Sequence, residues 1–423
     1  MEGPPAADDG SWFGASDGDD GAARVVCHVD MDCFYAACER LREPALRGEP
    51  VVVGMGYEPG ETHGAVATAS YEARTYGVES AQAISTALEA LPRKIEAATD
   101  PDLAVEDAGF YRPVDMDFYE SVAAEVKALL HERAGTVREV SIDEAYLDAS
   151  NAGWEGVEAF ARDLKADIER EVGVTASVGV APTMSAAKVA SDRDKPDGLV
   201  VVEPGEVQDF FAPLDVEAVH GVGPVTASEL REMGVETAGD LAATDPDRLA
   251  GRFGERGLAV RRYARGEDDR SVEPTGRPKS LSRESAFSEA TAEPERQRER
   301  VRTLATAVAA RAERKDVLYR TIGIKAVEPP FEVNTRAESL PGPVADADLV
   351  EETALSLFEE FAGDPVRKVG VRVSKLSFAD RDQASLDSYA DADADAGTGA
   401  AAEGGDESDP PAGRSGQRSL WEF

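Results

Sequence analysis

The chain has 423 residues, with 83 acidic against 45 basic side chains and a formal net charge of −38. The bases comprise 35 Arg and 10 Lys, and only 6% of residues are aromatic, a composition typical of proteins adapted to molar salt. At about 1 M salt the Debye length is about 3 Å, so the charge does not exclude an anionic partner. A hydrophobic content of 42% excludes a wholly disordered chain, and the length predicts about three domains.

The sequence contains no sign of export, membrane insertion or a zinc site. No apolar run approaches the roughly 18 residues of a membrane span, and the N-terminus lacks a secretory signal, so we expect a cytoplasmic protein without membrane contact. Cys27, Cys33 and Cys38 have no CxxC spacing, which favours reduced thiols. The four histidines form no HxxxH or HxxE pattern, which argues against a zinc hydrolase.

Hydrophobic patterning predicts folded segments between two disordered acidic ends, residues 1–23 and 379–416. Runs rich in β-branched residues predict strands at 24–30, 50–54, 65–68, 140–147, 175–180, 198–202, 319–325 and 367–376. Helices are expected at 31–39, from Ser70, at 117–133 and 155–171, as small units within 203–266, and at 292–315 and 346–363. The irregular alternation predicts an α+β fold whose first sheet is covered on one face.

Charge separates the last predicted domain from the rest of the chain. Residues 277–378 contain 17 acids and 17 bases, a net charge of zero in an otherwise acidic sequence. This local surplus of bases favours a nucleic-acid-binding face, although chance variation is the alternative. The bases expected on or beside its strands are Arg320, Lys325, Arg367, Arg372 and Lys375.

Acidic residues occupy two predicted strands where burial would be costly. Asp30 ends the first strand, and Asp143-Glu144 interrupts an apolar run. A surface turn could explain Asp143-Glu144 alone. If the strands are neighbours, the three carboxylates converge and require cations, and their oxygen ligands suit Mg²⁺. Nucleotidyl transfer needs such a cluster, because two metal ions activate the attacking 3′ oxygen and stabilise the leaving pyrophosphate.

Three strings around these acids resemble the signature motifs of Y-family translesion DNA polymerases, in the DinB or DNA polymerase IV branch and of haloarchaeal type. They are VDMDCFYA at 29–36, ATASYEAR at 67–74 and SIDEAY at 141–146. The resemblance extends over about residues 24–378 and implies an α+β right-hand polymerase. It divides the chain into a palm (24–33 and 99–201), fingers (34–98), a thumb (202–268), a linker (269–278) and a little finger (279–378).

The resemblance also implies a role for individual residues. Asp30, Asp143 and Glu144 become catalytic acids that hold two Mg²⁺, with the Met31 carbonyl as a further ligand. Tyr35 becomes the steric gate against ribonucleotides, with ordinary core packing as the alternative. The implied nucleotide-binding residues are Phe34, Tyr35, Thr68, Tyr71, Arg74 and Lys195.

Two departures from the family pattern stand out. Residues 93–117 form a longer and more acidic connection than usual, which we interpret as a surface insertion that leaves the finger–palm boundary open. Cys33 stands where some relatives carry Tyr, so any contact there would be through backbone.

The segment from His220 to Gly223 has helix-hairpin-helix character. Backbone amides at a glycine hairpin and a helix N-terminus can bind a DNA phosphate without reading sequence. We therefore expect Gly221 and Gly223 to contact DNA.

The last seven residues, 417–423, differ from the acidic tail before them. Gln417, Leu420 and Phe423 would share one side of a 3₁₀ turn, and they resemble a motif that binds a sliding clamp of the PCNA type. The usual second aromatic residue is missing, and a random apolar end is the alternative. A flexible tether to a clamp would raise the local concentration of enzyme at the primer end.

Together these features predict a monomeric, low-fidelity, template-directed polymerase that adds dNTPs to a primer on DNA and serves damage tolerance and repair. A nucleotide cyclase is a rival, because it uses similar carboxylates. A catalytically silent scaffold that binds only clamp and primer-template is a rival of another class. The sequence leaves the lesion specificity, error spectrum and regulation open.

Overall fold

The structure, a computed structural model, describes residues 24–378, which fall into two compact units divided between Thr275 and Gly276. The ends 1–23 and 379–423, including the expected clamp motif, lie outside the described residues. None of the helices within 24–378 has the length and apolar character needed to cross a bilayer.

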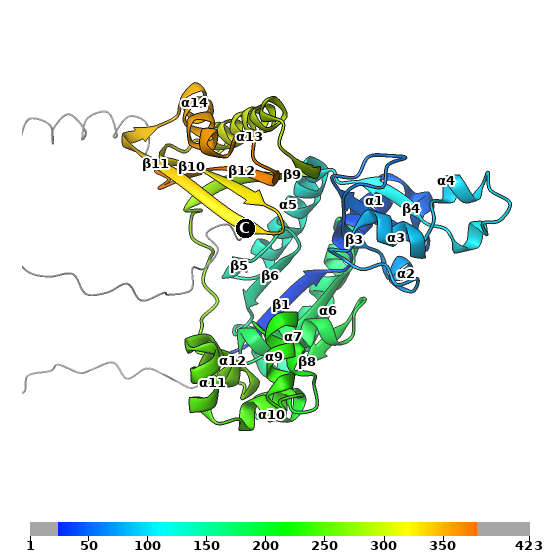
Figure 1. Ribbon diagram of the computed structural model, residues 1–423. Coiled ribbons are helices and arrows are strands. Elements are labelled where there is room, and N and C mark those ends of the chain that lie inside the picture. The colour runs from blue at the N-terminus through cyan, green and yellow to red at the C-terminus, as the bar shows by residue number, and fades with distance from the viewer. Residues whose placement is uncertain (1–23, 379–423) are drawn as a thin grey trace, which may run out of the picture. The chain divides into compact units, whose positions relative to one another are not determined.

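A five-stranded sheet forms the centre of the first unit (Figure 1). Its order is β5-β6-β1-β7-β8, with β1 antiparallel to both β6 and β7 and with β8 parallel to β7. The strands are β1 (Val26–Met31), β5 (Val137–Glu139), β6 (Glu144–Asp148), β7 (Ala176–Ala181) and β8 (Leu199–Val201). Segments far apart in sequence therefore meet on neighbouring strands.

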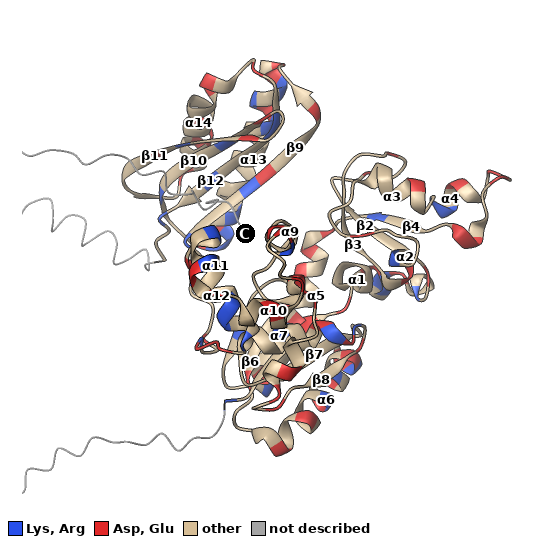
Figure 2. Cartoon of the chain, turned by 60° about the horizontal axis from the view of Figure 1, so that its bottom comes forward, with Lys and Arg blue, Asp and Glu red and all other residues tan. Residues whose placement is uncertain are grey.

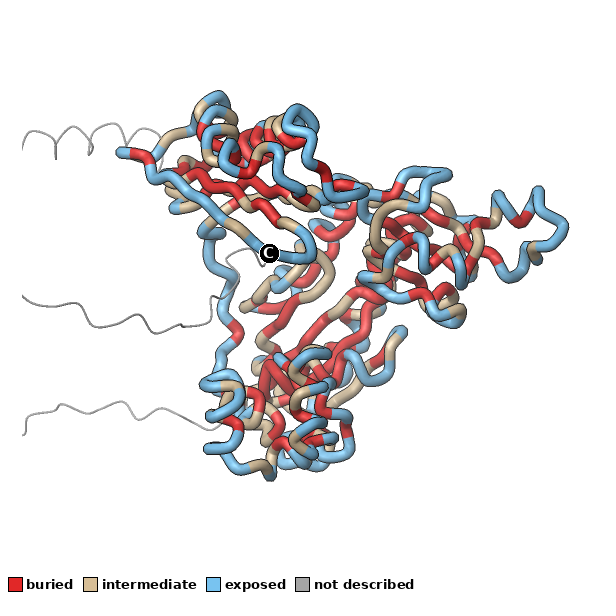
Figure 3. The backbone as a smooth tube through the Cα atoms, viewed as in Figure 1, coloured by how far each residue is buried: buried red, intermediate tan, exposed pale blue. Residues whose placement is uncertain are grey.

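Helices lie on both faces of this sheet. On one face, Cys27 and Val29 share a hydrophobic core with α5 (Met116–Arg133) and α6 (Gly153–Glu171). On the other, α7 (Met184–Arg193) lies over β1 and β7, where Gly179 leaves room for its backbone. The expectation of a sheet covered on one face was therefore wrong. Strand β1 is buried along most of its length, as Figure 3 shows.

The strand expected at 140–147 is shorter than the apolar run suggested. Residues 140–143 form a turn between β5 and β6, in which the amides of Val140 and Ser141 both donate to the Glu144 carbonyl. The Ser141 hydroxyl accepts from the amides of Asp143 and Glu144, each at 3.1 Å. These local bonds replace strand pairing and start β6 at Glu144.

A smaller sheet, β3-β2-β4, packs with short helices that precede and follow its strands in the chain. The elements are α1 (Phe34–Arg42), β2 (Val51–Met55), β3 (Ala65–Ala69), α2 (Tyr71–Arg74), α3 (Ile84–Ala90), α4 (Lys94–Ala97) and β4 (Phe110–Pro113). The Ser70 side chain caps α2 by accepting from the Ala73 amide at 3.3 Å, which confirms the expected helix start.

Residues 93–117 are only partly a surface insertion. They contain α4 and a 3₁₀ turn (Val105–Asp107), but they also supply β4, which pairs in parallel with β2. Arg93 and Tyr111 within the segment are buried. The prediction missed this because the acidic residues of the turn dominate the local composition.

Small helices follow, as expected, between 203 and 266. They are α8 (Val207–Phe211), α9 (Pro224–Glu232), α10 (Ala238–Ala243), α11 (Pro246–Phe253) and α12 (Glu255–Ala264). Proline occupies the first position of α9 and α11, where its missing N–H costs no hydrogen bond. Leu230 and Leu241 share a core with residues of α7.

The second unit is an antiparallel sheet, β11-β10-β12-β9, that shares one core with two helices. Its elements are β9 (Ser280–Thr291), α13 (Pro294–Arg314), β10 (Tyr319–Glu328), β11 (Glu332–Val344), α14 (Ala347–Phe358) and β12 (Val366–Ser374). A 3₁₀ turn (Glu359–Phe361) replaces the end of the helix expected at 346–363. The edge strand β11 is mostly exposed (Figure 3), and β9 carries both basic and acidic positions (Figure 2).

Gly179 tests the packing of α7. A Cβ at this position would collide with the Ala187 carbonyl oxygen and the Ser191 amide, so Gly179→Ala should lower the free energy of unfolding by about 3 kcal/mol or more. Gly156→Ala is the control, because its helical position is open and alanine should stabilise it by about 0.5–1 kcal/mol. Denaturant titration measures both, and equal stabilities would contradict the close approach of α7.

Candidate active site

The pairing of β1 with β6 brings the predicted acids together. Asp30 lies opposite Glu144 in the antiparallel register, and the Met31 amide donates to the Asp143 carbonyl at 2.9 Å. The acids were expected to converge if the two acid-bearing strands were neighbours, and this condition is met. Three carboxylates thus gather at one end of the sheet.

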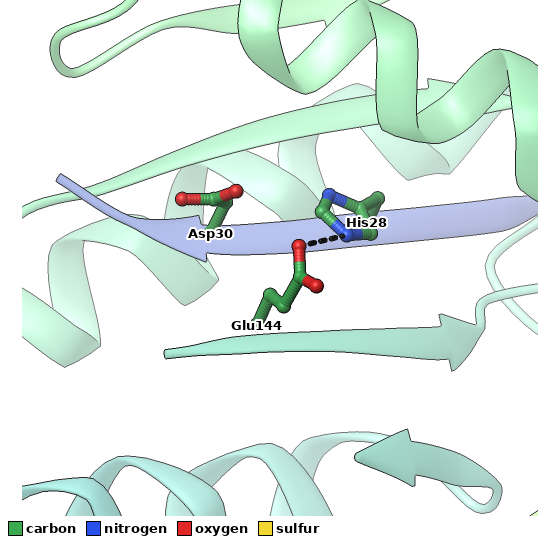
Figure 4. Close-up of side chains that lie close together, drawn as sticks. All are labelled: His28, Asp30 and Glu144. Atoms are coloured by element: carbon green, nitrogen blue, oxygen red, sulfur yellow. Dashed lines mark ion pairs between the residues drawn. The ribbon is translucent and has the colours of Figure 1, made fainter. Parts of the chain in front are cut away.

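A buried histidine belongs to this cluster, and the sequence interpretation missed it. His28 Nε2 lies 3.4 Å from Glu144 Oε2, and one ligand atom each from His28, Asp30 and Glu144 lie within 4.8 Å of one another (Figure 4). The Ser191 hydroxyl lies 2.8 Å from His28 Nδ1. The period-two pattern of a strand could have revealed His28, because residues 28 and 30 share a face.

Two lysine side chains balance part of the negative charge. Lys188 Nζ, on α7, lies 2.8 Å from Glu144 and 3.3 Å from Asp30. Lys195 Nζ lies 2.7 Å from Asp30 and 2.9 Å from Asp192. Lys195 was a predicted site residue, whereas Lys188 was not. Helical spacing places Lys188 beside Asp192, but its contacts with β1 and β6 depend on tertiary packing.

The acids differ in their electrostatic surroundings. His28, and then Lys188, hold the pKa of Glu144 at about 2 against the opposing effect of burial. Burial, followed by the charges of Asp30 and Glu144, raises the pKa of Asp143, although the Ser141 hydroxyl opposes the shift. No lysine or arginine within 24–378 forms an ion pair with Asp143.

The donor set fits hard divalent cations. Carboxylate oxygens are the ligands that Mg²⁺ prefers, and they come here from two strands and the turn before β6. Two ammonium groups lie beside three acids, and burial, followed by the charges of Asp30 and Glu144, raises the pKa of Asp143. Additional positive charge would therefore relieve repulsion.

A cleft of about 180 Å³ opens beside the acids. Eight predicted site residues line it: Asp30, Met31, Phe34, Thr68, Tyr71, Arg74, Asp143 and Lys195. Cys33, Ala67 and Ser80 complete the lining. Glu144 is not among these lining residues, and its carboxylate contacts Lys188 and His28.

Hydroxyl, guanidinium and ammonium groups face the cleft from three segments. Arg74 donates from Nε to the Ala69 carbonyl at 3.1 Å, and its guanidinium carbon lies 4.7 Å from the Tyr71 ring centroid. Thr68 comes from β3, and Lys195 follows α7. These groups have the chemistry of phosphate ligands.

Tyr35 lies in the first turn of α1, next to the cleft residue Phe34. Its ring stacks on the buried Tyr119 with centroids 4.7 Å apart and an interplanar angle of 17°. Burial, and then the charge of Asp143, raise the pKa of Tyr35. The side chain is half-buried, with a rigid aromatic support behind it.

The glycine hairpin precedes α9. Gly221 has φ 90°, which favours glycine, and Gly223 caps α9 in extended conformation. Arg256 donates to the Gly221 carbonyl at 2.9 Å. The expected hairpin before a helix is therefore present, and its DNA contact stays a prediction.

The five bases predicted in the second unit have different surroundings. Lys325 and Arg372 project from the sheet face opposite the core residues Ile324 and Val371, and Lys325 pairs with Glu284 at 3.0 Å. Arg367 instead packs on Phe331, at 4.1 Å from its ring centroid.

Arg372 and Lys375 line a separate cleft of about 550 Å³ together with Arg277, Lys279 and Phe378. Arg320 is exposed and donates to the Leu340 carbonyl at 3.1 Å. The nucleic-acid role of all five bases stays a prediction.

Comparison with known proteins covers both units. Residues 29–192 match the impB/mucB/samB family, residues 278–387 match the C-terminal domain of that family, and residues 204–235 match the IMS family HHH motif. DNA polymerase IV of Halobacterium salinarum is 62% identical over 364 residues, 86% of this chain and 87% of that protein. DNA polymerase IV of Methanoculleus marisnigri is 41% identical over 87% of this chain and 98% of its own.

Solved structures agree with these relatives. A Y-family DNA polymerase chimera of Dbh and Dpo4 superimposes with a TM-score of 0.72 and 28% identity, over 84% of this chain and all of that one. The insertion ternary complex of Dbh DNA polymerase gives 0.59 and 28%, over 83% of this chain and 98% of its own. The similarity includes the acid-bearing sheet, the hairpin and the second unit, and it defines a DNA-directed DNA polymerase of right-hand, α+β fold.

Within that class, the chain belongs to the Y family, in the DNA polymerase IV (DinB) branch of translesion enzymes.

Lys188 tests the charge balance of the acid cluster. Lys188→Met leaves Glu144 and Asp30 without this ammonium, so the free energy of unfolding without divalent metal should fall by about 3 kcal/mol. Added Mg²⁺ should restore part of the loss, because it binds only the folded state. Thermal melts with and without Mg²⁺ measure both effects.

Lys127→Met is the matched control. Lys127 pairs with Glu139 at 3.0 Å and is similarly exposed, at 23% against 26% for Lys188, but it does not touch the cluster. Its variant should respond to Mg²⁺ as the unmodified protein does. An equal Mg²⁺ response in both variants would contradict the proposed charge balance.

Proposed function

We propose that this polymerase extends primer 3′ ends on damaged DNA by two-metal nucleotidyl transfer, with Asp30, Asp143 and Glu144 as its catalytic acids. The observation that carries the proposal is the single cleft that has carboxylates at one end and Thr68, Tyr71, Arg74 and Lys195 along its wall. The ternary complex described for the similar Dbh polymerase supports binding of primer-template and incoming dNTP.

Each group in the cleft has a task that its chemistry suits. Asp30 and Asp143, with the Met31 carbonyl, would hold two Mg²⁺, which supply a Lewis acid for the attacking and leaving oxygens. Glu144 would complete the set near the primer end, held in place by His28 and Lys188. Arg74 and Lys195 would bind the triphosphate, and Phe34 would form the floor beneath it.

We assign the family's regions to the boundaries that the motifs suggest. The palm comprises 24–33 and 99–201, except for β4, which pairs with β2 and which we assign to the fingers together with 34–98. The thumb comprises 202–268 and the little finger 279–378, after a linker at 269–278. Gly221 and Gly223 of the thumb would bind DNA phosphate, and so would Arg320, Lys325, Arg367, Arg372 and Lys375. The enzyme would act as a monomer in the cytoplasm.

Rival functions fit the residues less well. A nucleotide cyclase would need neither the glycine hairpin nor the second unit. A silent scaffold would not need three carboxylates held together at a cost in repulsion. Primer extension with Mg²⁺ separates these possibilities, because only a polymerase lengthens the primer.

Asp143 tests the catalytic assignment. Asp143→Asn keeps the side-chain shape but removes a charged metal ligand, so single-nucleotide incorporation should fall by about two orders of magnitude or more. Affinity for primer-template should change little, because the acid binds metal and not DNA. Asp163→Asn, on the exposed side of α6, is the control. Incorporation by Asp143→Asn at a tenth of the unmodified rate would contradict the assignment of Asp143 as a catalytic acid.

Tyr35 tests the steric gate. Tyr35→Ala removes the ring that Tyr119 supports, and discrimination between dCTP and CTP should fall by one or more orders of magnitude as the sugar pocket opens. Phe118→Ala, which removes another ring beside Tyr119, should leave discrimination intact. Competition assays with both nucleotides measure the ratio, and an unchanged ratio for Tyr35→Ala would move the gate elsewhere.

Recruitment by a sliding clamp also belongs to the proposal. Gln417, Leu420 and Phe423 would bind a PCNA-type clamp, and deletion of 417–423 should abolish clamp binding in calorimetry and clamp-stimulated synthesis. Synthesis without the clamp should stay unchanged, since the acidic tail separates the motif from the catalytic region. Arg418→Ala is the control. Undiminished affinity of the truncated chain would exclude this motif as the interface.

A further inference from the structure

A buried carboxylate outside the catalytic set connects two segments that line the cleft and holds both beside Ser177 of β7. Asp32 is 4% exposed, and its Oδ1 accepts a hydrogen bond from the Tyr71 hydroxyl at 3.1 Å. The Ser177 hydroxyl lies within hydrogen-bonding distance of both carboxylate oxygens, at 2.9 and 3.1 Å. The Asp197 amide donates to Oδ2 at 2.8 Å. Asp32 itself does not line the cleft.

One of these segments is the turn that carries Lys195. Besides the Asp197 amide bound by Asp32, the next amide, of Gly198, donates to the Ser177 hydroxyl at 3.1 Å. Asp197 has φ 57°, a left-handed conformation that is unfavourable for a residue other than glycine. Asp32 and Ser177 together hold this turn against β7, two residues after Lys195.

The second segment is α2, which carries two proposed triphosphate ligands. Asp32 fixes the Tyr71 hydroxyl, and the Tyr71 ring in turn lies 4.7 Å from the guanidinium carbon of Arg74. The Asp32 carboxylate therefore connects two groups of cleft residues. Tyr71 and Arg74 follow β3 of the small sheet, and Lys195 follows α7, which packs on the central sheet.

Burying the Asp32 carboxylate has an energetic cost. Burial raises the pKa of Asp32, although hydrogen bonds from Asp197, Ser177 and Tyr71 oppose the shift. Within residues 24–378 no lysine or arginine forms an ion pair with Asp32. Its hydrogen bonds come from amide and hydroxyl donors, and the charge of Lys195 adds a smaller attraction. An apolar side chain of similar volume would avoid this desolvation but would hold neither segment.

We propose that Asp32 is the positioning residue of the triphosphate site, which sets the distance between Tyr71 and Arg74 on one wall and Lys195 on the other. The inference rests on the proposed function, since it assumes that these residues bind the incoming nucleotide. Asp32 acts through them and touches neither metal nor substrate. Its contribution should therefore appear in nucleotide affinity rather than in the chemical step.

The test is the nearly isosteric variant Asp32→Asn. It keeps one acceptor oxygen but loses the charge, and the equilibrium dissociation constant for the correct dNTP should rise about 10- to 100-fold, as expected for a lost charge-assisted hydrogen bond. Calorimetry on the complex with a dideoxy-terminated primer measures this without reaction. In single-turnover assays the maximal incorporation rate should change far less than the affinity does.

Two controls separate positioning from folding. Asp167→Asn removes the charge of an aspartate that is equally buried, at 5%, but that pairs with Arg133 and Arg170 away from the cleft. It should lower the melting temperature without changing dNTP affinity. In a Tyr71→Phe background, the effect of Asp32→Asn should shrink, because one of the connections is already lost.

The outcomes are distinct. If Asp32→Asn does not fold, Ser177→Ala, which frees the Gly198 amide, should still weaken dNTP binding, and unchanged affinity there would overturn the proposal. A folded Asp32→Asn with normal affinity, or with a loss confined to the maximal rate, would overturn it as well. Failure of the unmodified chain to extend a primer would instead refute the function on which the inference rests.

Discussion

The register between β1 and β6 is the constraint on which the site depends. Because Asp30 pairs with Glu144, the hydrogen bonds of the sheet hold carboxylates close together, and their repulsion is part of the folded state. The structure offsets that repulsion with Lys188, Lys195 and the imidazole of His28. Cation binding is thus favoured by a charge arrangement that the backbone imposes.

Helix α7 has a central part in this balance. It lies on the face of the sheet that carries His28, Asp30 and Glu144, and it approaches closely because Gly179 has no side chain. From this position it supplies both Lys188 and the Ser191 hydroxyl that contacts His28. The close packing of α7 on the sheet therefore also determines which groups surround His28, Asp30 and Glu144.

Salt screens the exposed acidic residues more strongly than the acids of the site. Exposed carboxylates are screened within a few ångströms at molar salt, so most of the −38 charge exerts little force at a distance. The acids of the site are partly buried, where screening by salt is much weaker. Burial and the charges of Asp30 and Glu144 raise the pKa of Asp143, whereas His28 and Lys188 lower the pKa of Glu144, although the two acids are neighbours in the chain.

The sequence by itself determined the family, most strands and helices, and eight residues of the cleft, since motif spacing and hydrophobic period are local properties. It also indicated that the acids would converge if the strands of Asp30 and Asp143-Glu144 were neighbours. It did not predict the turn at 140–143, because the Ser141 side-chain bonds compete with an apolar pattern that reads as strand.

Only the tertiary structure decided the surroundings of those residues. The period-two pattern of β1 indicates only that His28 shares a face with Asp30, and Lys188 and Asp32 carry no such signal. Their partners are Glu144 on another strand, or Tyr71 and Asp197, 39 and 165 residues further along the chain. The pairing of β4 with β2 was hidden in the same way within an acidic segment. Residue type and spacing specify what a side chain can bind, whereas long-range packing decides which charges and donors surround it.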